Sequence, residues 1–455
     1  MEPRIRVRET RTTGLKARQL PGLKSTDRLL GGRSSVKARP LAAGLFRIVV
    51  TSLAIAACAG EPVDPPVASG PVASPLADAR TFRSMEDFLD GYWNRPIPPQ
   101  GAPAAEWSTL EASLAPPQCG TCHVPQYEDW QTAIHSRAYS PGLAGQLVGR
   151  EASDFRFVRG CLVCHSPLSE QQARLPLPGG GFGTNPDFDH KLKQGGLVCA
   201  ACHVRGQVRH GPPTREGSTA PSAEGMPHGG VVRTEYFEDS RFCAGCHQFA
   251  SPAPNGKSLQ NTYEEWLDSR YATEGVSCQT CHMPDRRHLW RGIHDPDMVR
   301  SGVTIEWMRS DETGGGRVGL RVTNSGTGHR FPTYVTPAVD VTLELLDANR
   351  NQISGASRSA EIGRAVALQG GVWVETRDTR LPPDSAMTLT YTAPPEARFV
   401  RGTVRVRPDA FYRNVFAGML GRTMTDTSRV LIKEAHEGSI ASPYMIFDDT
   451  VAIVR

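Results

Sequence analysis

The sequence lacks two features: spare cysteines that could form a structural disulfide, and an apolar run long enough to span a membrane. Only one of its 11 cysteines, Cys58, lies outside a repeated pentapeptide pattern, so no cysteine pair is left over for a structural disulfide. The most apolar stretch, residues 41–57, is shorter than the roughly 20 residues of an ordinary transmembrane helix and is interrupted by Arg47. These absences argue against a disulfide-stapled scaffold and against an ordinary membrane-spanning helix.

A strong net charge is also missing once the N-terminus is set aside. Residues 1–57 carry 12 Lys and Arg against 3 Asp and Glu, whereas residues 58–455 carry 39 against 44. The larger part of the chain is therefore slightly acidic, which argues against a nucleic-acid-binding surface.

The chain is long enough for two or three domains, each with its own core. It has 455 residues, of which 39% are hydrophobic. Its 45 glycines and 36 prolines make up about 18% of the chain, which indicates many turns and excludes a mostly helical or coiled-coil protein.

The N-terminus has the pattern of an export signal. Lys37 and Arg39 precede the apolar stretch, which ends in small residues. Its last residues, Ile55-Ala56-Ala57-Cys58, resemble a bacterial lipoprotein cleavage box, and Ala59 resembles the outer-membrane sorting pattern. We therefore predict a signal or targeting segment at 1–57 and an acylated Cys58 that anchors the protein to a membrane.

Three further expectations concern this end of the chain. The alternative for Cys58 is an ordinary buried thiol at the end of a core helix. Residues 1–35 are longer and more basic than most signal starts, so we expect translation to begin near Val36. Residues 58–79 are rich in Pro, Ala and Ser without periodicity, which predicts a lipidated tether.

The other ten cysteines form five copies of the pattern Cys-x-x-Cys-His, spaced 35 to 44 residues apart. Such spacing is too short for each copy to belong to a conventional domain. The copies are CGTCH (Cys119, Cys122, His123), CLVCH (Cys161, Cys164, His165), CAACH (Cys199, Cys202, His203), CAGCH (Cys243, Cys246, His247) and CQTCH (Cys278, Cys281, His282).

This pattern suits covalent attachment of haem. Two thiols three positions apart lie about one helical turn from each other, so both can form thioethers with the vinyl groups on one haem edge. The adjacent histidine then reaches the iron as proximal ligand. Zinc sites also use Cys-x-x-Cys pairs, but zinc does not require a histidine directly after the second cysteine. The sequence therefore predicts five covalently attached c-type haems that share one core.

Each iron can take a second, distal ligand from the residues outside the motifs. Eight histidines remain, which allows five bis-histidine haems without demanding them, and Met226 or Met283 is an alternative at one iron. These eight are His135, His190, His210, His228, His288, His294, His329 and His436.

The motif region resembles the multihaem cytochromes c with a cytochrome c-552/4 domain, related to the tetrahaem electron carrier of ammonia-oxidising bacteria. The resemblance covers about residues 115–300 and rests on CGTCHVPQYEDWQTAIHSRA, GLVCAACHVRGQVRH and YEEWLDSRYATEGVSCQTCHMP. It implies a loop-rich domain of short helices at residues 80–298, with helices at each motif and around Tyr263–Tyr271. The fifth motif and the C-terminal extension depart from the family pattern.

The same resemblance ranks the distal ligands. His135 and His210 come first, followed by His288 and His294 just after the last motif. His190 and His228, in loops rich in Gly and Pro, stay candidates.

The C-terminal third has a different texture. No cysteine follows residue 298, and alternating runs at Val339–Leu346, Met387–Thr392 and Thr403–Val406 are separated by turn residues. This pattern predicts an antiparallel β-sandwich at 299–455, so that the fold class is α+β. The segment NSGTGHRFPTY resembles a Gly-His-x-x-Pro-Thr loop of β-domains appended to this family, which makes His329 a candidate distal ligand; the alternative is a turn histidine.

Three functions stay open at this point. The first is an electron carrier that relays electrons between redox protein partners at the cell envelope, periplasmic or surface-facing on the outer membrane. The second is a redox enzyme in which one five-coordinate haem binds a small nitrogen or sulfur substrate, although no Cys-x-x-Cys-Lys motif is present. The third, compatible with the first, is docking of a partner by the β-sandwich. Arg205, Arg209, Arg286 and Arg287 are candidates for anion or haem-propionate binding.

Overall fold

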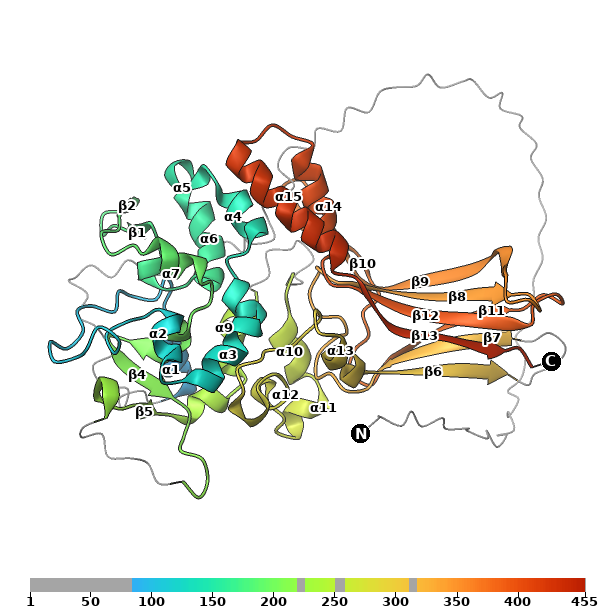
Figure 1. The fold of residues 1–455 in the computed structure, drawn as a ribbon, viewed down its shortest axis with the longest axis horizontal. Coiled ribbons are helices and arrows are strands. Elements are labelled where there is room, and N and C mark those ends of the chain that lie inside the picture. The colour runs from blue at the N-terminus through green and yellow to red at the C-terminus, as the bar shows by residue number, and fades with distance from the viewer. Residues whose placement is uncertain (1–83, 219–225, 250–257, 311–316, 455) are drawn as a thin grey trace, which may run out of the picture. The chain divides into compact units, whose positions relative to one another are not determined.

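The computed structural model describes residues 84–218, 226–249, 258–310 and 317–454 (Figure 1). Cys58, the predicted signal segment and the tether therefore lie outside the described residues, as do the predicted turn glycines at 314–316. Among the helices that are described, none is long and apolar enough to cross a bilayer.

The N-terminal region, residues 84–302, is built from short helices and a few two- to four-residue strands (Figure 1). Its helices are α1 (Met85–Tyr92), α2 (Pro116–Gly120), α3 (Val124–Thr132), α4 (Pro141–Leu147), α5 (Arg150–Ser153), α6 (Phe155–His165), α7 (His190–Gln194), α8 (Cys199–His203), α9 (Arg241–His247), α10 (Thr262–Leu267), α11 (Arg270–Thr273), α12 (Cys278–His282) and α13 (Pro296–Gly302). Its strands are β1 (Arg174–Pro176), β2 (Phe182–Thr184), β3 (Val204–Arg205), β4 (Val208–Gly211) and β5 (Val232–Arg233).

Local sequence explains why these helices start where they do. The side chains of Ser84, Asp189 and Asp295 accept hydrogen bonds from the first free N–H groups of α1, α7 and α13. Proline occupies the first turn of several others, where its missing N–H costs nothing. The helices predicted at every motif and around 263–271 are confirmed.

The C-terminal region, residues 303–454, contains two antiparallel sheets (Figure 1). The five-stranded sheet has the order β10-β9-β8-β12-β13, and the three-stranded sheet has the order β11-β7-β6. The strands are β6 (Val303–Ser310), β7 (Arg317–Asn324), β8 (Ala338–Leu346), β9 (Gln352–Gln369), β10 (Val372–Asp378), β11 (Ala386–Thr392), β12 (Phe399–Arg407) and β13 (Tyr444–Ala452). The three predicted strand segments are confirmed as β8, β11 and part of β12.

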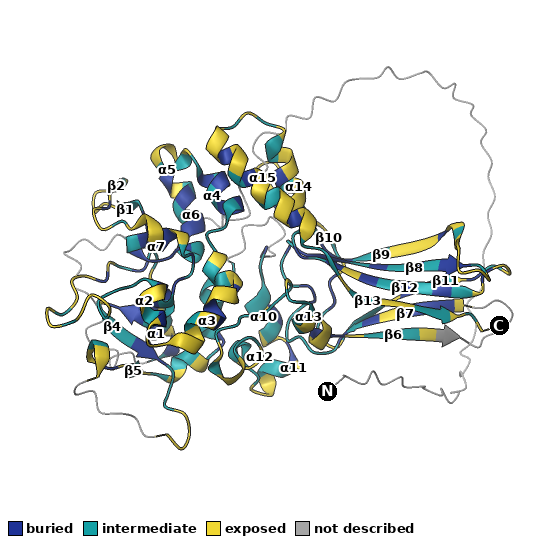
Figure 2. Cartoon of the chain, viewed as in Figure 1, coloured by how far each residue is buried: buried dark blue, intermediate teal, exposed yellow. Residues whose placement is uncertain are grey.

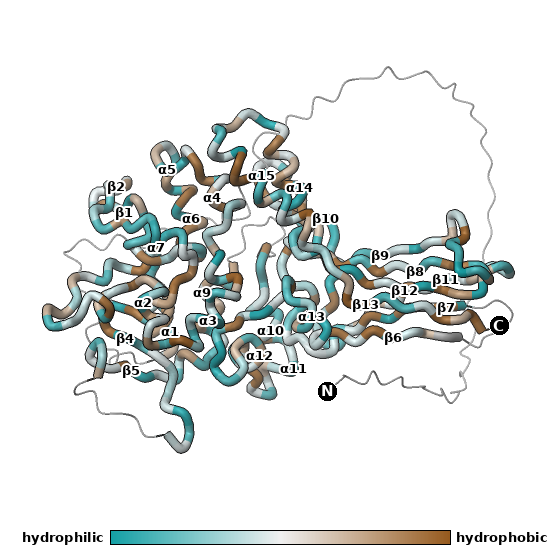
Figure 3. Tube along the Cα trace, in the orientation of Figure 1, coloured by the Kyte–Doolittle hydropathy of each residue, from teal (hydrophilic) through white to brown (hydrophobic). Residues whose placement is uncertain are grey.

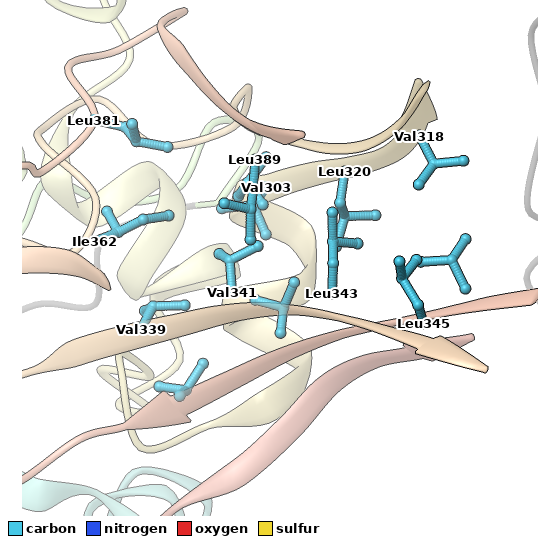
Figure 4. Close-up of a cluster of buried hydrophobic side chains, with 14 of the residues drawn as sticks. Val303, Val318, Leu320, Val339, Val341, Leu343, Leu345, Ile362, Leu381 and Leu389 are labelled. Carbon is cyan, nitrogen blue, oxygen red and sulfur yellow. The ribbon is translucent and has the colours of Figure 1, made fainter. Parts of the chain in front are cut away.

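One hydrophobic core lies between the two sheets. Alternate residues of β8 point inward, so that Val339, Val341, Leu343 and Leu345 are fully buried, and Leu320 of β7 and Leu389 of β11 face them from the other sheet (Figure 4). The Cα trace coloured by hydropathy shows hydrophobic and hydrophilic residues alternating along the strands of these sheets (Figure 3). The register pairs Leu343 with Gly402, where the Trp307 ring covers the space that a Cβ would fill.

The prediction of strands alone after residue 299 was incomplete. Two helices, α14 (Ala410–Leu420) and α15 (Asp426–Ala441), interrupt the strands between β12 and β13. They pack on α4 of the N-terminal region, where a Cβ on Gly145 would come within 2.9 Å of Ile432. Their outer faces are exposed (Figure 2). The apolar residues of this segment recur at helical spacing, and the β-sandwich prediction had assigned no element to it.

Candidate haem centre

Each Cys-x-x-Cys-His motif lies at the C-terminal end of a short helix. His165, His203, His247 and His282 are the last residues of α6, α8, α9 and α12, and His123 follows α2. Within one helical turn the two thiols and the imidazole share a face; the N–H of His123 donates to the carbonyl of Cys119, four residues back, at 2.9 Å. We number the motifs 1 to 5 in chain order.

The ten motif cysteines are all free thiols, and several thiols of different motifs touch. Hydrogen bonds join Cys119 to Cys199, Cys164 to Cys246 and Cys243 to Cys278, and each lowers the pKa of one sulfur: that of Cys119 to about 7, of Cys246 to about 6 and of Cys278 to about 7. Cys202 lies close enough to Cys246 for their charges to interact. The attachment edges of motifs 1 and 3, 2 and 4, 4 and 5, and 3 and 4 are therefore neighbours.

Three proximal histidines face a second histidine at the spacing that one iron requires. Two metal–nitrogen bonds of about 2.0 Å, each extended by about 1.1 Å from nitrogen to ring centre, put the two ring centroids about 6 Å apart. The observed centroid separations are 6.2 Å for His135 and His247, 6.0 Å for His203 and His288, and 6.4 Å for His282 and His329. Motifs 4, 3 and 5 thus each have a distal histidine in ligand geometry.

The rings are also oriented and neutral, as metal ligands must be. Nδ1 of most of them donates to a backbone carbonyl, which leaves Nε2 free for a metal. Burial, together with nearby histidines, lowers the pKa of His135 to about 3 and those of His247 and His288 to about 4, so the rings stay uncharged at neutral pH. The Nδ1 partners are the carbonyls of Ala138 for His165, His210 for His203, Arg291 for His282, Arg286 for His288 and Arg330 for His329.

Motif 1 has a less tightly paired distal side. His228 lies near enough to His123 for their charges to interact, but their rings do not form a pair at the 6.0–6.4 Å spacing. The N–H of His228 donates to Oε1 of Glu111 at 3.1 Å. Hydrogen bonds from Ser108 and from this N–H lower the pKa of Glu111 to about 2. Arg209, stacked 4.9 Å from the Trp107 ring centre, binds the Glu111 carbonyl.

Motif 2 lacks a histidine partner at this spacing. All thirteen histidines belong to the described residues, and none of the ring contacts among those residues joins His165 to another histidine. Its neighbour Cys164 instead accepts a hydrogen bond from Nη1 of Arg95 at 3.2 Å.

Two predicted distal ligands, His210 and His294, form no ring pair with a proximal histidine among the described ring contacts. His210 is 1% exposed, and both of its ring nitrogens are buried without a hydrogen-bond partner. Its ring packs edge-on against Tyr92. His294 donates or accepts at Asp409, 3.0 Å away, on the surface. The roles of these two residues as ligands stay predictions without support from the geometry.

The structure also places the other candidate ligands and the candidate arginines. His190 is exposed at the start of α7, His436 lies in α15, and Met226 is exposed. Among the arginines, Arg286 pairs with Glu238 and Arg287 with Asp129. Arg205 is 1% exposed and stacks 3.8 Å from the Tyr92 ring centre, with one Nη atom unpaired.

The donor set fits haem better than a bare metal ion. Within the described parts of the chain, no three His, Cys, Asp or Glu side chains converge as ligands of one ion. Paired imidazoles about 6 Å apart, each beside a Cys-x-x-Cys turn, match an iron held between two rings in a covalently attached macrocycle.

Comparison with known proteins agrees with this geometry. The sequence model of the cytochrome c552 family matches residues 102–295. The matched segment makes up less than half of the chain, so the similarity to the cytochrome c552 family concerns this segment. It agrees with the five Cys-x-x-Cys-His motifs, which suit several c-type haems.

Individual relatives resemble only part of the chain. Cytochrome c nitrite reductase subunit NrfA of Nitratidesulfovibrio vulgaris is 24% identical over 229 residues, which are 43% of this chain and 42% of the relative. Cytochrome c-552 of Desulfotalea psychrophila is 26% identical over 181 residues, 37% of this chain and 34% of the relative. The chain thus spans less than half the length of these curated relatives.

A solved structure shares the fold. The penta-heme cytochrome c552 from Thermochromatium tepidum superimposes with a TM-score of 0.55 at 17% identity and covers 76% of this chain and 100% of its own. At that identity the likeness concerns the fold alone.

Sequence reasoning missed the residues that hold the distal ligands. The carboxylates of Glu111, Asp129 and Glu265 accept main-chain N–H bonds at or beside His228, His288 and His329. The partners are 117, 159 and 65 residues apart in sequence, so no local motif could have indicated them.

Proposed function

We propose that the chain carries five c-type haems and relays electrons between redox protein partners at the cell envelope. The observation that carries this proposal is the contact between thiols of different motifs, which links all five attachment sites into one connected set. When bound, each haem supplies a one-electron iron couple. The chain's contribution is to hold neighbouring attachment edges in contact, and the distance between two redox centres is what limits transfer between them.

The contacts order the sites as motifs 1, 3, 4 and 5, with motif 2 attached to motif 4. Cys122 of motif 1 and Cys281 of motif 5 are exposed, whereas Cys161 of motif 2 is 2% exposed. Partners would then exchange electrons at motifs 1 and 5, the two accessible ends. Paired neutral histidines at motifs 3, 4 and 5 favour transfer over substrate chemistry, because the two histidines of a pair would hold one iron between them and leave it no position for a substrate.

The envelope location of the proposal depends on the N-terminus. Acylation of Cys58 would anchor the protein to a membrane through the tether at 58–79, and Ala59 favours the outer membrane. Cys58→Ser should move the protein from the membrane fraction to the soluble fraction and abolish labelling with a radioactive fatty acid. Retention of both would refute the anchor.

The relay is tested by counting spin states in the oxidised, haem-loaded protein. Electron paramagnetic resonance and near-infrared magnetic circular dichroism should give five haems, with low-spin bis-histidine centres at motifs 3, 4 and 5. Rapid reduction of all five by a single electron donor, with no slow fraction, is expected if the sites are connected. A haem that stays oxidised on this timescale would contradict the proposed connection.

A second candidate function is reduction of a small nitrogen or sulfur substrate at motif 1 or motif 2. It is favoured by the absence of a paired histidine at His123 and His165 among the described ring contacts, and by Arg209 and His228 beside motif 1. One relative is described as a nitrite reductase subunit. Binding of nitrite or hydroxylamine to a high-spin haem, lost in Arg209→Gln, would support this alternative; five low-spin haems that bind neither would exclude it.

A further inference from the structure

Glu265 of α10 connects the N-terminal region to the loop that carries His329. Its side chain is 6% exposed and accepts from Nη1 of Arg380 at 3.0 Å. Its Oε2 accepts the main-chain N–H of Arg330 at 3.2 Å and the hydroxyl of Thr333 at 3.3 Å. The residue next to the distal histidine of motif 5 is therefore bonded directly to a buried carboxylate on another segment.

Asp129 of α3 holds the loop of His288 in the same way. Its carboxylate is 6% exposed and accepts the main-chain N–H of His288 at 3.0 Å through Oδ2. The guanidinium of Arg287 binds both carboxylate oxygens. Because the bonds come from the histidine's own N–H and from the preceding side chain, Asp129 restrains the main chain on which the ligand is carried.

His135, the distal histidine of motif 4, provides an internal comparison. Its carbonyl accepts the main-chain N–H groups of Leu197 at 3.0 Å and Ala138 at 3.2 Å. Among the hydrogen bonds of the described residues, none joins its main chain to a carboxylate. Regular main-chain packing restrains this ligand, whereas the other two lie on irregular loops: Phe331 pairs with Leu381 in one isolated bridge only, and Arg286 has a φ of +60°.

We propose that the two buried carboxylates, Asp129 and Glu265, are positioning residues for distal haem ligands. Asp129 keeps His288 at the iron of motif 3, and Glu265 keeps His329 at the iron of motif 5. The inference rests on the proposed multihaem function. A ligand on a loop exchanges with the solvent at the rate at which its loop moves, and a charge-assisted hydrogen bond to the loop's main chain slows that motion.

For motif 5 the same contact also couples two regions of the chain. Arg380, 6% exposed, binds Glu265 and, through two bonds, Asp378 at the end of β10. The ligand loop of the C-terminal region is thus held against α10 by the Glu265 carboxylate, and the hydroxyls of Thr262 and Thr333 form a second hydrogen bond there at 2.8 Å. Loosening this contact frees the distal position of motif 5 without touching either histidine.

The test compares Asp129→Asn and Glu265→Gln with Glu128→Gln and Glu264→Gln in the haem-loaded protein. The control residues are exposed neighbours on the same helices. Carbon monoxide binds ferrous haem by replacing the distal ligand, so its binding rate reports how often that ligand leaves. We expect each buried-carboxylate variant to bind carbon monoxide at least tenfold faster at one haem and the controls to match the wild type. Rates equal to those of the controls would overturn the proposal.

Thermal unfolding measured in parallel separates positioning from simple stabilisation. A purely structural role lowers the melting temperature while leaving carbon monoxide binding in the native state unchanged, and that result counts against the proposal. If a variant loads fewer than five haems, Arg287→Gln and Thr333→Val serve instead: the first removes the guanidinium that binds Asp129, and the second removes one hydroxyl bond to Glu265. These milder variants should still accelerate binding, by less than the carboxylate variants; no acceleration in either would overturn the proposal.

Reference variants distinguish failure of the inference from failure of the proposed function. His288→Gly and His329→Gly should each convert one low-spin haem to high spin. If both stay fully low-spin, the ligand assignment itself is wrong. If both become high-spin while the carboxylate variants behave like their controls, only the positioning role is wrong.

Discussion

The two regions of the chain bury apolar side chains in different ways. The C-terminal region supplies 18 of the 19 residues of the cluster between its sheets, with Val299 of α13 as the other member, and it shares a small cluster with Leu259. The N-terminal region, although longer, has separate clusters of seven, six and three. A sandwich closes its core with protein alone, whereas in the N-terminal region the volume between clusters belongs to the motif cysteines and histidines. Haem attached at the motifs would therefore add buried apolar surface to the N-terminal region, whereas the sandwich core needs none.

Expression without haem should produce the largest difference in stability between the two regions. Expressed without haem attachment, the chain should leave residues 84–302 without stable tertiary structure, because their protein-only clusters are too small to offset the conformational entropy of so many loops. The C-terminal region should keep its strand content. Limited proteolysis with mass spectrometry should then yield a resistant fragment spanning the sheets. Equal resistance of both regions in the haem-free chain would contradict the comparison.

A cavity in the sandwich core should instead destabilise the C-terminal region. Leu343 is fully buried, so Leu343→Ala should lower the free energy of unfolding of the C-terminal region by about 2–5 kcal/mol. The haem spectra of motifs 1 to 4 should stay unchanged. The control is Val372→Ala, whose side chain is 41% exposed and should cost far less. Both are measured by denaturant unfolding followed by far-ultraviolet circular dichroism.

A substitution at the contact between α4 and α15 tests whether the N-terminal and C-terminal regions unfold together. Gly145→Ala places a Cβ within 2.9 Å of Ile432, and overpacking of this kind costs about 1–3 kcal/mol. Gly418→Ala in α14 adds the same methyl where nothing lies within 4 Å. We expect two separate unfolding transitions by calorimetry in the first variant. A single unchanged transition in both variants would show that this contact does not couple the regions.

The smallest expected effect on stability comes from removing a surface ion pair that joins two strands of the sandwich. Arg401 of β12 binds both carboxylate oxygens of Asp448 on β13, and these hydrogen bonds lower the pKa of Asp448. Because the folded-state pKa is depressed, the pair stabilises the fold above the unfolded-state value of about 3.9, and this stability is lost as the pH falls through the folded-state pKa.

Asp448→Asn should therefore cost about 0.2–1 kcal/mol at neutral pH, and the difference from the wild type should vanish in acid. Thermal unfolding of the C-terminal region between neutral and acidic pH measures it. A difference that grows as the pH falls would show that the variant acts by another route.

Regular local patterns were the predictable part of the fold. The alternation in residues 339–346 predicted β8, and a short helix was expected at every motif. The β-sandwich prediction named no helix for residues 410–441, where α14 and α15 lie. His329 and His288 were candidates from their sequence context, but their proximal partners, His282 and His203, follow from no spacing along the chain.

By itself, the sequence determined what attaches to this protein and how the chain divides. Spacing of one helical turn places two thiols and an imidazole on one face, and alternation places Val and Leu on one side of a strand; both are local geometry. Only the tertiary structure decided which histidine opposes which, and that Asp129 and Glu265 hold distant loops. These pairings join residues 47 or more positions apart, and such contacts depend on how the whole chain packs.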